Sequence, residues 1–390
     1  VTVQGPQPDQ LRIEARDSLR LGPGAAIRAD GAGYGSNARH SSCSDGGARN
    51  GGMHGGGPAG QTCGDYEWPV LAGPGGSSGE YAGGSGGGAV MLVCNATESS
   101  AMELNGTVSV DGQSGRAYTS GSGSASGGGA GGSLLVVASR LSGSGTLSAD
   151  GGAGADGHGS YDSNGGSGGR IALHAYQPSR AAAFTGTVRA RAGAAYGSWS
   201  VQAAAGTVYW CDGRASESDA AVEGEANLHR CGVRRLELDN GELRETSYYP
   251  QLSVAGGRRR FVIDELHLGS PVMMSMQAPS DFDPVSAPES RSSVVIGDVT
   301  GSAVSHSRVS VADGTTWTLA GSVVASHRVG LIARSVETRS MGLNGSVAVE
   351  TVSRTINLDS GRISLGHTTV ERWGRLVLSR HIIIAPGASL

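Results

Sequence analysis

Short apolar runs recur behind clusters of small residues along the first 270 positions of the chain. The runs occupy residues 89–93, 133–137, 170–173 and 207–210, and each follows a stretch rich in glycine or alanine. Their first residues lie 44, 37 and 37 positions apart. A near-constant period of this kind indicates stacked, repeated units.

A second pattern lies between these runs. Residues 25–31, 105–112, 144–151 and 185–191 align with one another and alternate apolar with small or polar side chains. Alternation with a period of two is typical of a half-buried β-strand. The sequence therefore predicts a unit of strand, turn, strand and turn that spans about 40 residues.

The pattern changes towards the C-terminus. Residues 1–270 are predicted to hold the glycine-rich repeats, and residues 292–390 a second, more regular series of short strands with less glycine. Between them, residues 271–291 contain four prolines and little periodicity, which predicts a linker or a long loop.

Composition sharpens the expected fold class. The chain has 67 glycines among 390 residues, with 5% aromatic and 16% charged residues, so a conventional large core is not expected. Glycine permits the close backbone approach of stacked rungs. We predict an all-β fold, a parallel β-helix or solenoid with long glycine-rich loops, in which residues 46–60 form one such surface loop.

Charge and hydropathy argue against a nucleic-acid partner and against a membrane span. The basic residues are all arginine, the net charge is −4, and the longest basic run is residues 258–260, so no nucleic-acid partner is expected. No apolar run approaches the roughly 18 residues of a membrane span. Because the chain starts at Val1 and stops within a repeat-like stretch, we expect a fragment or a processed product.

Glycosylation signals and cysteines both point to secretion. Asn95, Asn105 and Asn344 each begin an N-glycosylation triplet, so N-linked glycans are expected there. Two local disulfides are the simplest cysteine pairing, Cys43 with Cys63 and Cys211 with Cys231. Each would close a loop of about 20 residues and stabilise the fold by roughly 3 kcal/mol. The expected location is extracellular or at the cell surface.

Cys94 is left over by this pairing. It ends the apolar run that begins at residue 89, so it is either a buried free thiol or a bridge to another chain, and both readings stay open. The other cysteines lack the paired spacing of zinc sites, so no metal site is expected from them.

Sites for chemistry are sparse. A polysaccharide lyase or hydrolase needs converging carboxylates, but Asp281 and Asp283 lie in the proline-containing segment and Asp264 and Glu265 alternate faces of one strand. No cofactor is expected, although Asp150, Asp156 and Asp162 could supply oxygens to a weak calcium site beside a lone copy of a glycine-aspartate repeat. The histidines His158, His174 and His267 are expected to be satisfied or solvated.

The glycine-rich motifs at residues 129–138, 141–152, 165–173, 206–209 and 238–241 resemble repeats of very large secreted or cell-surface proteins of protists. The resemblance covers about residues 11–269. It implies a β-helical extracellular shaft, as in adhesion proteins, matrices or mastigoneme-like filaments, and it carries no catalytic residues. The excursion between Cys211 and Cys231 departs from the simplest form of the motif.

These observations predict a structural extracellular protein rather than an enzyme. The expected role is a solenoid shaft segment of a glycosylated surface filament or matrix, with partners in other copies or other filament proteins. The alternative is a carbohydrate-binding or adhesive cell-surface module, in which exposed aromatic side chains would stack on sugars: Tyr196, Trp199, Tyr209, Trp210 and Trp317. A polysaccharide lyase or hydrolase is the third reading.

Overall fold

A computed structural model describes most of the N-terminal half of the chain and mainly strands beyond it. The described residues are 10–41, 43, 51–57, 63–94, 100–119, 123–157, 161–176, 184–197, 203–214, 231–241, 249–252, 260–269 and 273–276, with strand segments between 293 and 384. The chain forms two compact units, Val1–Arg234 with Thr246–Tyr248, and Arg235–Glu245 with Tyr249–Leu390. Apart from one strand at residues 273–276, the predicted linker at 271–291 lies outside the described residues.

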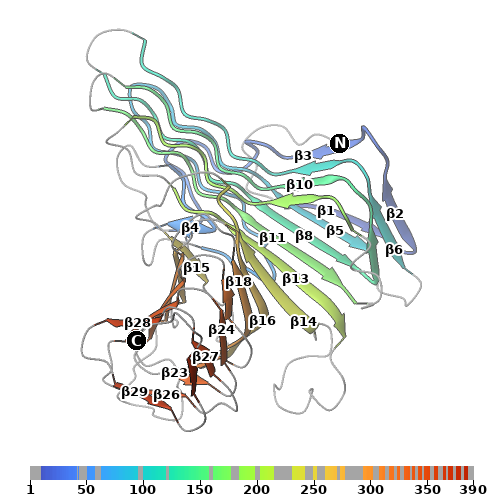
Figure 1. Cartoon of the computed structure of the whole chain (residues 1–390). Helices are drawn as coiled ribbons and strands as arrows, with labels where there is room; N and C mark the ends of the chain where they lie inside the picture. Colours follow the sequence, from blue (N-terminus) through green and yellow to red (C-terminus); the bar gives the residue numbers. More distant parts are fainter. Residues whose placement is uncertain are drawn as a thin grey trace. The chain divides into compact units, whose positions relative to one another are not determined.

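The apolar runs of the first unit form one parallel sheet (Figure 1). Its strands, in spatial order, are β1 (Gln10–Ala15), β5 (Ala89–Cys94), β8 (Ser133–Ala138), β11 (Arg170–Ala175) and β13 (Thr207–Arg214). Their apolar positions stack in register, Leu11 beside Val90, then Leu134, Ile171 and Val208. The sequence period thus corresponds to one strand of this sheet for each repeat.

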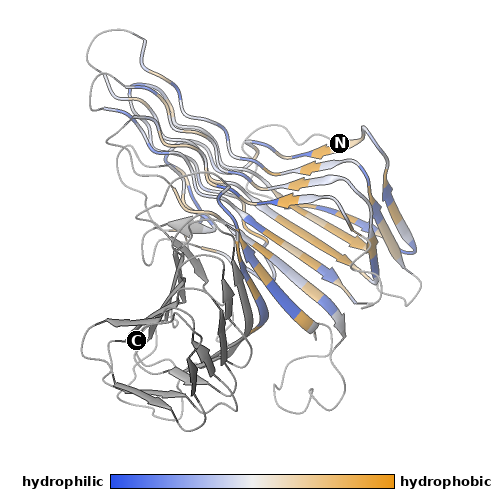
Figure 2. Ribbon diagram, viewed as in Figure 1, coloured by the Kyte–Doolittle hydropathy of each residue, from blue (hydrophilic) through white to orange (hydrophobic). Residues whose placement is uncertain are grey.

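Two smaller parallel sheets complete the core of this unit. One contains β2 (Ser18–Leu21), β6 (Ala101–Leu104) and β9 (Arg140–Ser142), and the other β3 (Ala26–Arg28), β7 (Thr107–Ser109), β10 (Thr146–Ser148) and β12 (Thr187–Arg189). Leu134, Leu141 and Leu147, from the three sheets, are fully buried in one cluster. Figure 2 shows the apolar residues concentrated on these strands. Alternate side chains therefore supply a narrow but continuous apolar core.

The predicted fold class is wrong. The parallel sheets are present, but they are small and do not form a regular β-helix or solenoid, and the glycine-rich stretches are not loops. These stretches run side by side as extended segments next to the sheets (Figure 1). Residues 51–55, predicted to lie in a long surface loop, are all buried among them. Glycine-rich sequence has no side-chain period, so it did not reveal that these stretches form ordered extended segments of their own.

Backbone hydrogen bonds of residues 127–132 show how these segments are held. Successive amides donate to three different neighbouring segments in turn: Gly127 and Ala130 to Ser77 and Pro74, Gly128 and Gly131 to Asn164 and Ser167, and Gly129 and Gly132 to Gln113 and Val110. A period of three is that of the polyproline II conformation, which makes no hydrogen bonds within itself. A β-strand would direct its amides to two sides only. We call this arrangement the glycine bundle; it comprises residues 31–38, 51–55, 72–79, 83–88, 110–118, 125–132, 149–157, 163–169, 190–197 and 203–206.

Close approach explains the glycines of the bundle. A β-carbon on Gly128 would lie 2.0 Å from the carbonyl oxygen of Gly152, and one on Gly166 would lie 2.0 Å from that of Gly129. Neither residue is among the glycines with positive φ. The requirement is therefore steric, as at the crowded axis of a collagen triple helix.

The second unit is a series of short parallel strands. β16 (Arg260–Leu268) pairs with the C-terminal half of β14 (Cys231–Leu238) and with β18 (Ser293–Gly301). Further rows are β20 (Thr316–Leu319), β23 (Val336–Thr338), β26 (Thr355–Leu358) and β29 (Arg375–Leu378); β21 (Val323–Ala325), β24 (Met341–Asn344), β27 (Ile363–Leu365) and β30 (Ile382–Ile384); and β15 (Tyr249–Leu252), β17 (Met273–Met276), β19 (Ser307–Val311), β22 (Val329–Ala333), β25 (Val347–Thr351) and β28 (Thr368–Glu371). The strands predicted from residue 292 onwards are present.

The first unit also contains the two-residue strand β4 (Gly56–Gly57). The described residues contain no α-helix, and so no helix with the length and apolar character of a membrane span.

Candidate functional site

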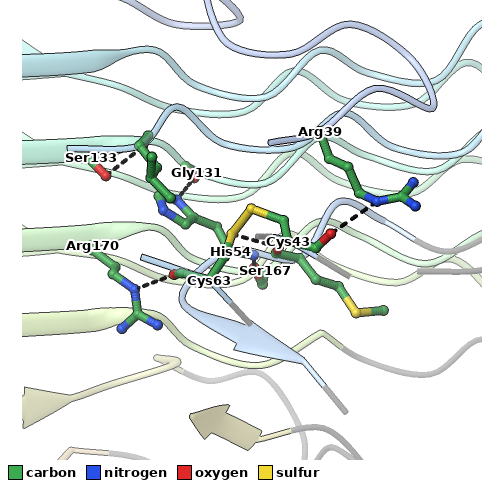
Figure 3. The surroundings of a disulfide bond; sticks show 10 residues. Arg39, Cys43, His54, Cys63, Gly131, Ser133, Ser167 and Arg170 are labelled. Atoms are coloured by element: carbon green, nitrogen blue, oxygen red, sulfur yellow. Dashed lines mark hydrogen bonds between the residues drawn. A yellow bond between two sulfur atoms is a disulfide. The ribbon is translucent and has the colours of Figure 1, made fainter. Parts of the chain in front are cut away.

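The Cys43–Cys63 disulfide closes a stretch of chain within the first unit (Figure 3). We call its described residues, 51–57, the strap. Within the strap, the His54 amide donates to Ser167 Oγ at 2.8 Å, and the His54 Nδ1 lies 2.9 Å from the Gly131 carbonyl oxygen. Because a carbonyl only accepts, Nδ1 carries the hydrogen. Both partners belong to the glycine bundle, so the strap is an integral part of that layer.

Arg170 is the most unusual residue beneath the strap. It begins β11 and is fully buried, although arginine is rarely buried without partners. Its Nε donates to the Cys63 carbonyl at 2.9 Å, and its Nη1 donates to Thr207 Oγ1 at 3.3 Å. Burial lowers the Arg170 pKa to about 10, while Asp65 and Tyr66 oppose that shift, so the guanidinium stays charged at neutral pH.

Burial and the charge of Arg170 together keep the neighbouring His54 neutral. Burial, and secondarily the Arg170 charge, lower the pKa of His54 to about 3. His54 is therefore neutral at physiological pH. The sequence analysis predicted a role for neither residue. An arginine at the first position of an otherwise apolar strand, as at Arg170, was the pattern that could have indicated a buried charge.

Aromatic side chains cover the next part of the same sheet. Trp68 stacks on His174 with ring centroids 4.3 Å apart, and Tyr66 meets Tyr209 edge to face at 5.5 Å. His174 Nε2 lies 2.8 Å from the Glu67 carbonyl oxygen. Burial raises the pKa of Tyr66 well above its ordinary value, so its phenol stays neutral. Of the two predicted alternatives for His174, satisfied or solvated, the structure shows the first: the ring is buried and hydrogen-bonded.

The second disulfide joins Cys211 on β13 to Cys231 on β14. Both disulfides have the local pairing that the sequence favoured. They indicate an oxidising, extracellular-type environment. Tyr209 Oη lies 3.5 Å from Cys231 Sγ, which places this disulfide beside the aromatic cluster.

A ladder of three aspartates connects four successive repeats. The Asp111 amide donates to the Asp30 carboxylate at 2.9 Å, the Asp150 amide to Asp111 at 2.7 Å, and the Arg191 amide to Asp150 at 2.8 Å. Arg189 also forms an ion pair with Asp150 at 2.6 Å. Each carboxylate thus fixes the backbone of the next repeat.

Burial governs the titration of this ladder. Desolvation raises the pKa of Asp111 to about 6, with smaller contributions from the Asp150 and Asp30 charges. Desolvation also raises the pKa of Asp150. The ladder therefore holds carboxylates in an environment that disfavours their charge.

The predicted calcium ligands have different hydrogen-bond partners. The Asp150 carboxylate bonds to Arg189 and to the Arg191 amide in the ladder. Asp162 accepts from the Gly157 amide at 3.0 Å, and the Asp156 carbonyl accepts from the Tyr118 amide at 2.9 Å. A weak calcium site at Asp150, Asp156 and Asp162 stays a prediction.

The glycosylation residues have different positions. The Asn105 side chain is partly buried and accepts a 3.0 Å hydrogen bond from the Ser144 amide. Asn344 ends β24, but its side chain lies outside the described part of the structure. The whole of Asn95 lies outside it as well. Glycans at these three residues stay predictions.

Cys94 is fully buried in the core cluster, and its Sγ lies 3.5 Å from the Ala101 carbonyl oxygen.

The candidate sugar-stacking aromatics do not share one exposed surface. Tyr209 and Trp210 are buried in the first unit, whereas Tyr196 is 47% exposed. Trp199 and the Trp317 side chain lie outside the described residues. Among the candidate acids, Asp264 is half-buried and Glu265 is exposed on β16, whereas Asp281 and Asp283 lie outside the described residues. Of the remaining histidines, His267 is half-buried and His158 lies outside the described residues.

Comparison with known proteins gives no relative: no protein-family model, no curated protein and no solved structure matches the chain. The glycine bundle, the two disulfides and the aspartate ladder are therefore the observations from which a function has to be argued.

Proposed function

We propose that this chain is a structural segment of an extracellular filament or matrix. The glycine bundle is the observation that carries the proposal. The backbone amides of its segments donate to neighbouring segments, and those of residues 127–132 donate to three neighbours in turn. At most of its glycines a methyl group would overlap with backbone atoms of a neighbouring segment. A layer built in this way suits a stiff spacer, because its shape is held by many backbone bonds rather than by mobile side chains.

Two features support an extracellular structural role. The disulfides Cys43–Cys63 and Cys211–Cys231 fasten the strap and the end of the first unit covalently. The aspartate ladder adds side-chain bonds between repeats at Asp30, Asp111 and Asp150. Both features resist separation of the segments that they join, as a structural element under tension requires.

Open strand edges support self-association or assembly with other filament proteins. Among the described strands of the first unit, β1 and β2 are each the terminal strand of their sheet. A terminal strand can pair with a further strand. Both strands belong to one stretch of chain, residues 10–21.

Electron microscopy tests the proposal. An antibody raised against this chain should label fibres or a sheet-like matrix outside the producing cells, and the purified, oxidised chain should form concentration-dependent end-to-end assemblies. Labelling confined to the cell interior, with a purified chain that stays monomeric at all concentrations, would overturn it.

A carbohydrate-binding role is the second candidate, and one observation favours it. Tyr161 and Tyr196 are 43% and 47% exposed. Tyr161 lies two residues before Ser163, whose carbonyl accepts from the Tyr196 amide in the neighbouring segment. Exposed aromatic faces stack on the apolar faces of sugars. A glycan array with the wild type and a Tyr161→Ala/Tyr196→Ala variant tests it, with Tyr34→Ala as the control. Specific binding that is lost in the double variant only would establish this role, and absence of saturable binding would dismiss it.

A further inference from the structure

One cluster in the first unit combines two sulfurs and an imidazole. His174, Cys211 and Cys231 are all buried, and one ligand atom from each lies within 4.8 Å of the others. Strand pairing produces this arrangement, because His174 on β11 is directly opposite Cys211 on β13. In the oxidised protein the two sulfurs are bonded to each other, so neither is a thiolate.

A hydrogen bond to the backbone fixes the tautomer of the histidine in this cluster. Its Nε2 lies 2.8 Å from the Glu67 carbonyl oxygen, which only accepts, so Nε2 carries the hydrogen and Nδ1 the lone pair. Metal-bound histidines commonly donate their second ring N–H to a carbonyl in this way, which fixes both tautomer and ring orientation. Stacking on Trp68 restrains the ring further.

The surroundings favour soft, dehydrated coordination. Tyr209 is fully buried beside His174, and the buried Tyr66 packs on Tyr209, so bulk water is kept from the cluster. Two thiolates and an imidazole are ligands of thiophilic ions such as Zn²⁺ and Cu⁺.

We propose that reduction of Cys211–Cys231 converts this cluster into a Cys₂His site for a thiophilic d¹⁰ ion. A dithiol reductant supplies two electrons and two protons; the protein S–S bond breaks, two cysteine thiols form, and the reductant becomes its own disulfide. The ion then displaces the two thiol protons and binds both thiolates together with His174 Nδ1. Metal and disulfide are mutually exclusive, so the site reports the redox state that the chain has experienced.

The second disulfide provides a matched control. Among the described residues, Cys43 and Cys63 belong to no group of three potential metal ligands. Both disulfides close loops of the same sequence separation, 20 residues. Reduction of Cys43–Cys63 should therefore create two thiols without creating this site.

Cobalt titration of the full chain tests the proposal. The protein is reduced, freed of reductant without oxygen and titrated with Co²⁺, and the expected result is one equivalent bound with a sulfur-to-cobalt charge-transfer band that Zn²⁺ abolishes. A parallel titration with Cu⁺ against a chromophoric chelator distinguishes the two ions. The oxidised chain should show no such band.

Variants assign the band to its ligands. Cys43→Ser/Cys63→Ser should retain it, whereas Cys211→Ser/Cys231→Ser should lose it and His174→Gln should shift its energy and weaken binding. The near-ultraviolet circular dichroism of the reduced wild type, compared with the oxidised form, checks that the aromatic cluster persists. The proposal is overturned if the reduced wild type binds no ion, if the cluster collapses on reduction, or if the band survives loss of Cys211 and Cys231.

Discussion

A β-carbon on Gly129 would lie 2.1 Å from the carbonyl oxygen of Ser85. The two residues belong to neighbouring segments of the glycine bundle, and atoms at that separation would overlap. The Gly129 amide also donates at 2.8 Å to Gln113, on a third segment. Glycine at this position therefore sets the spacing of three segments at once.

Gly129→Ala should consequently destabilise the first unit. The added methyl group meets backbone rather than a flexible side chain, so the bundle has to separate locally. Overpacking of this kind typically costs about 1–3 kcal/mol, occasionally more. Chemical denaturation of the oxidised chain measures the change in the free energy of unfolding.

Gly35→Ala is the matched control for this change. Gly35 is a bundle glycine without positive φ, and a β-carbon there would meet nothing within 4 Å. Its replacement should be neutral or should stabilise by roughly 0.4–1 kcal/mol through the unfolded state. Equal losses of stability in the two variants would contradict the steric account of the bundle.

The bundle also shows what the sequence could and could not predict. The strands at residues 89–93 and 133–137 were predictable because apolar side chains carry the period of a buried strand. The bundle was not, because its order lies in backbone bonds between segments such as 127–132 and 72–79, and glycine has no side chain to record the partner. Composition indicates close approach, but it does not say which segments approach.

The aspartate ladder predicts an inverted pH dependence. The Asp111 pKa is raised from 3.8 to about 6 by burial, so the folded state holds more protons than the unfolded state between these values. Stability contributed by this residue therefore falls as pH rises through that window, by at most roughly 3 kcal/mol. Asp111→Asn keeps an oxygen acceptor for the Asp150 amide and removes the titration. The variant should be more stable than wild type at about pH 7.5 and similar at about pH 4.

Thermal unfolding across this pH range checks the expectation. Asp17→Asn, at an exposed position, serves as the control and should follow the wild-type profile. If Asp111→Asn lowered stability at every pH, the charged carboxylate would instead be a net stabiliser of the ladder.

Cys94 should be unreactive in the folded chain. Its thiol is fully buried, and burial raises its pKa, so little thiolate forms and the reagent has no access. A pulse of iodoacetamide followed by mass spectrometry should find Cys94 unmodified in the native chain and alkylated after denaturation. Stoichiometric native labelling, or a disulfide-linked dimer through Cys94, would show that this part of the core opens and would restore the reading of a bridge to another chain.

The chemistry around the strap was less predictable than its disulfide. Proximity along the chain made Cys43–Cys63 and Cys211–Cys231 the simplest pairing, but proximity does not indicate what each loop covers. The contact of Arg170 with Cys63 joins residues 107 positions apart, and that of His174 with Glu67 spans the same separation. Such long-range polar contacts depend on how the strap folds back over β11, which no local pattern encodes.

Removal of the Cys43–Cys63 disulfide should loosen one edge of the bundle. Cys43→Ser/Cys63→Ser frees a strap whose amides at Gly52 and Gly55 donate to the carbonyls of Gly128 and Gly168. The chain-entropy model predicts a loss of about 3 kcal/mol. Hydrogen exchange should therefore accelerate at Gly52 and Gly55 in this variant.

The spatial pattern of that acceleration distinguishes local from global loosening. The Asn105 amide donates to the Leu21 carbonyl, between β2 and β6, and does not depend on the strap. Its exchange should be unchanged if the disulfide acts through the strap alone, and the Cys211→Ser/Cys231→Ser variant should leave Gly52 and Gly55 protected. Uniform acceleration at all three amides would mean that the disulfide stabilises the first unit as a whole, because the bundle and the small sheets would then open as one cooperative unit.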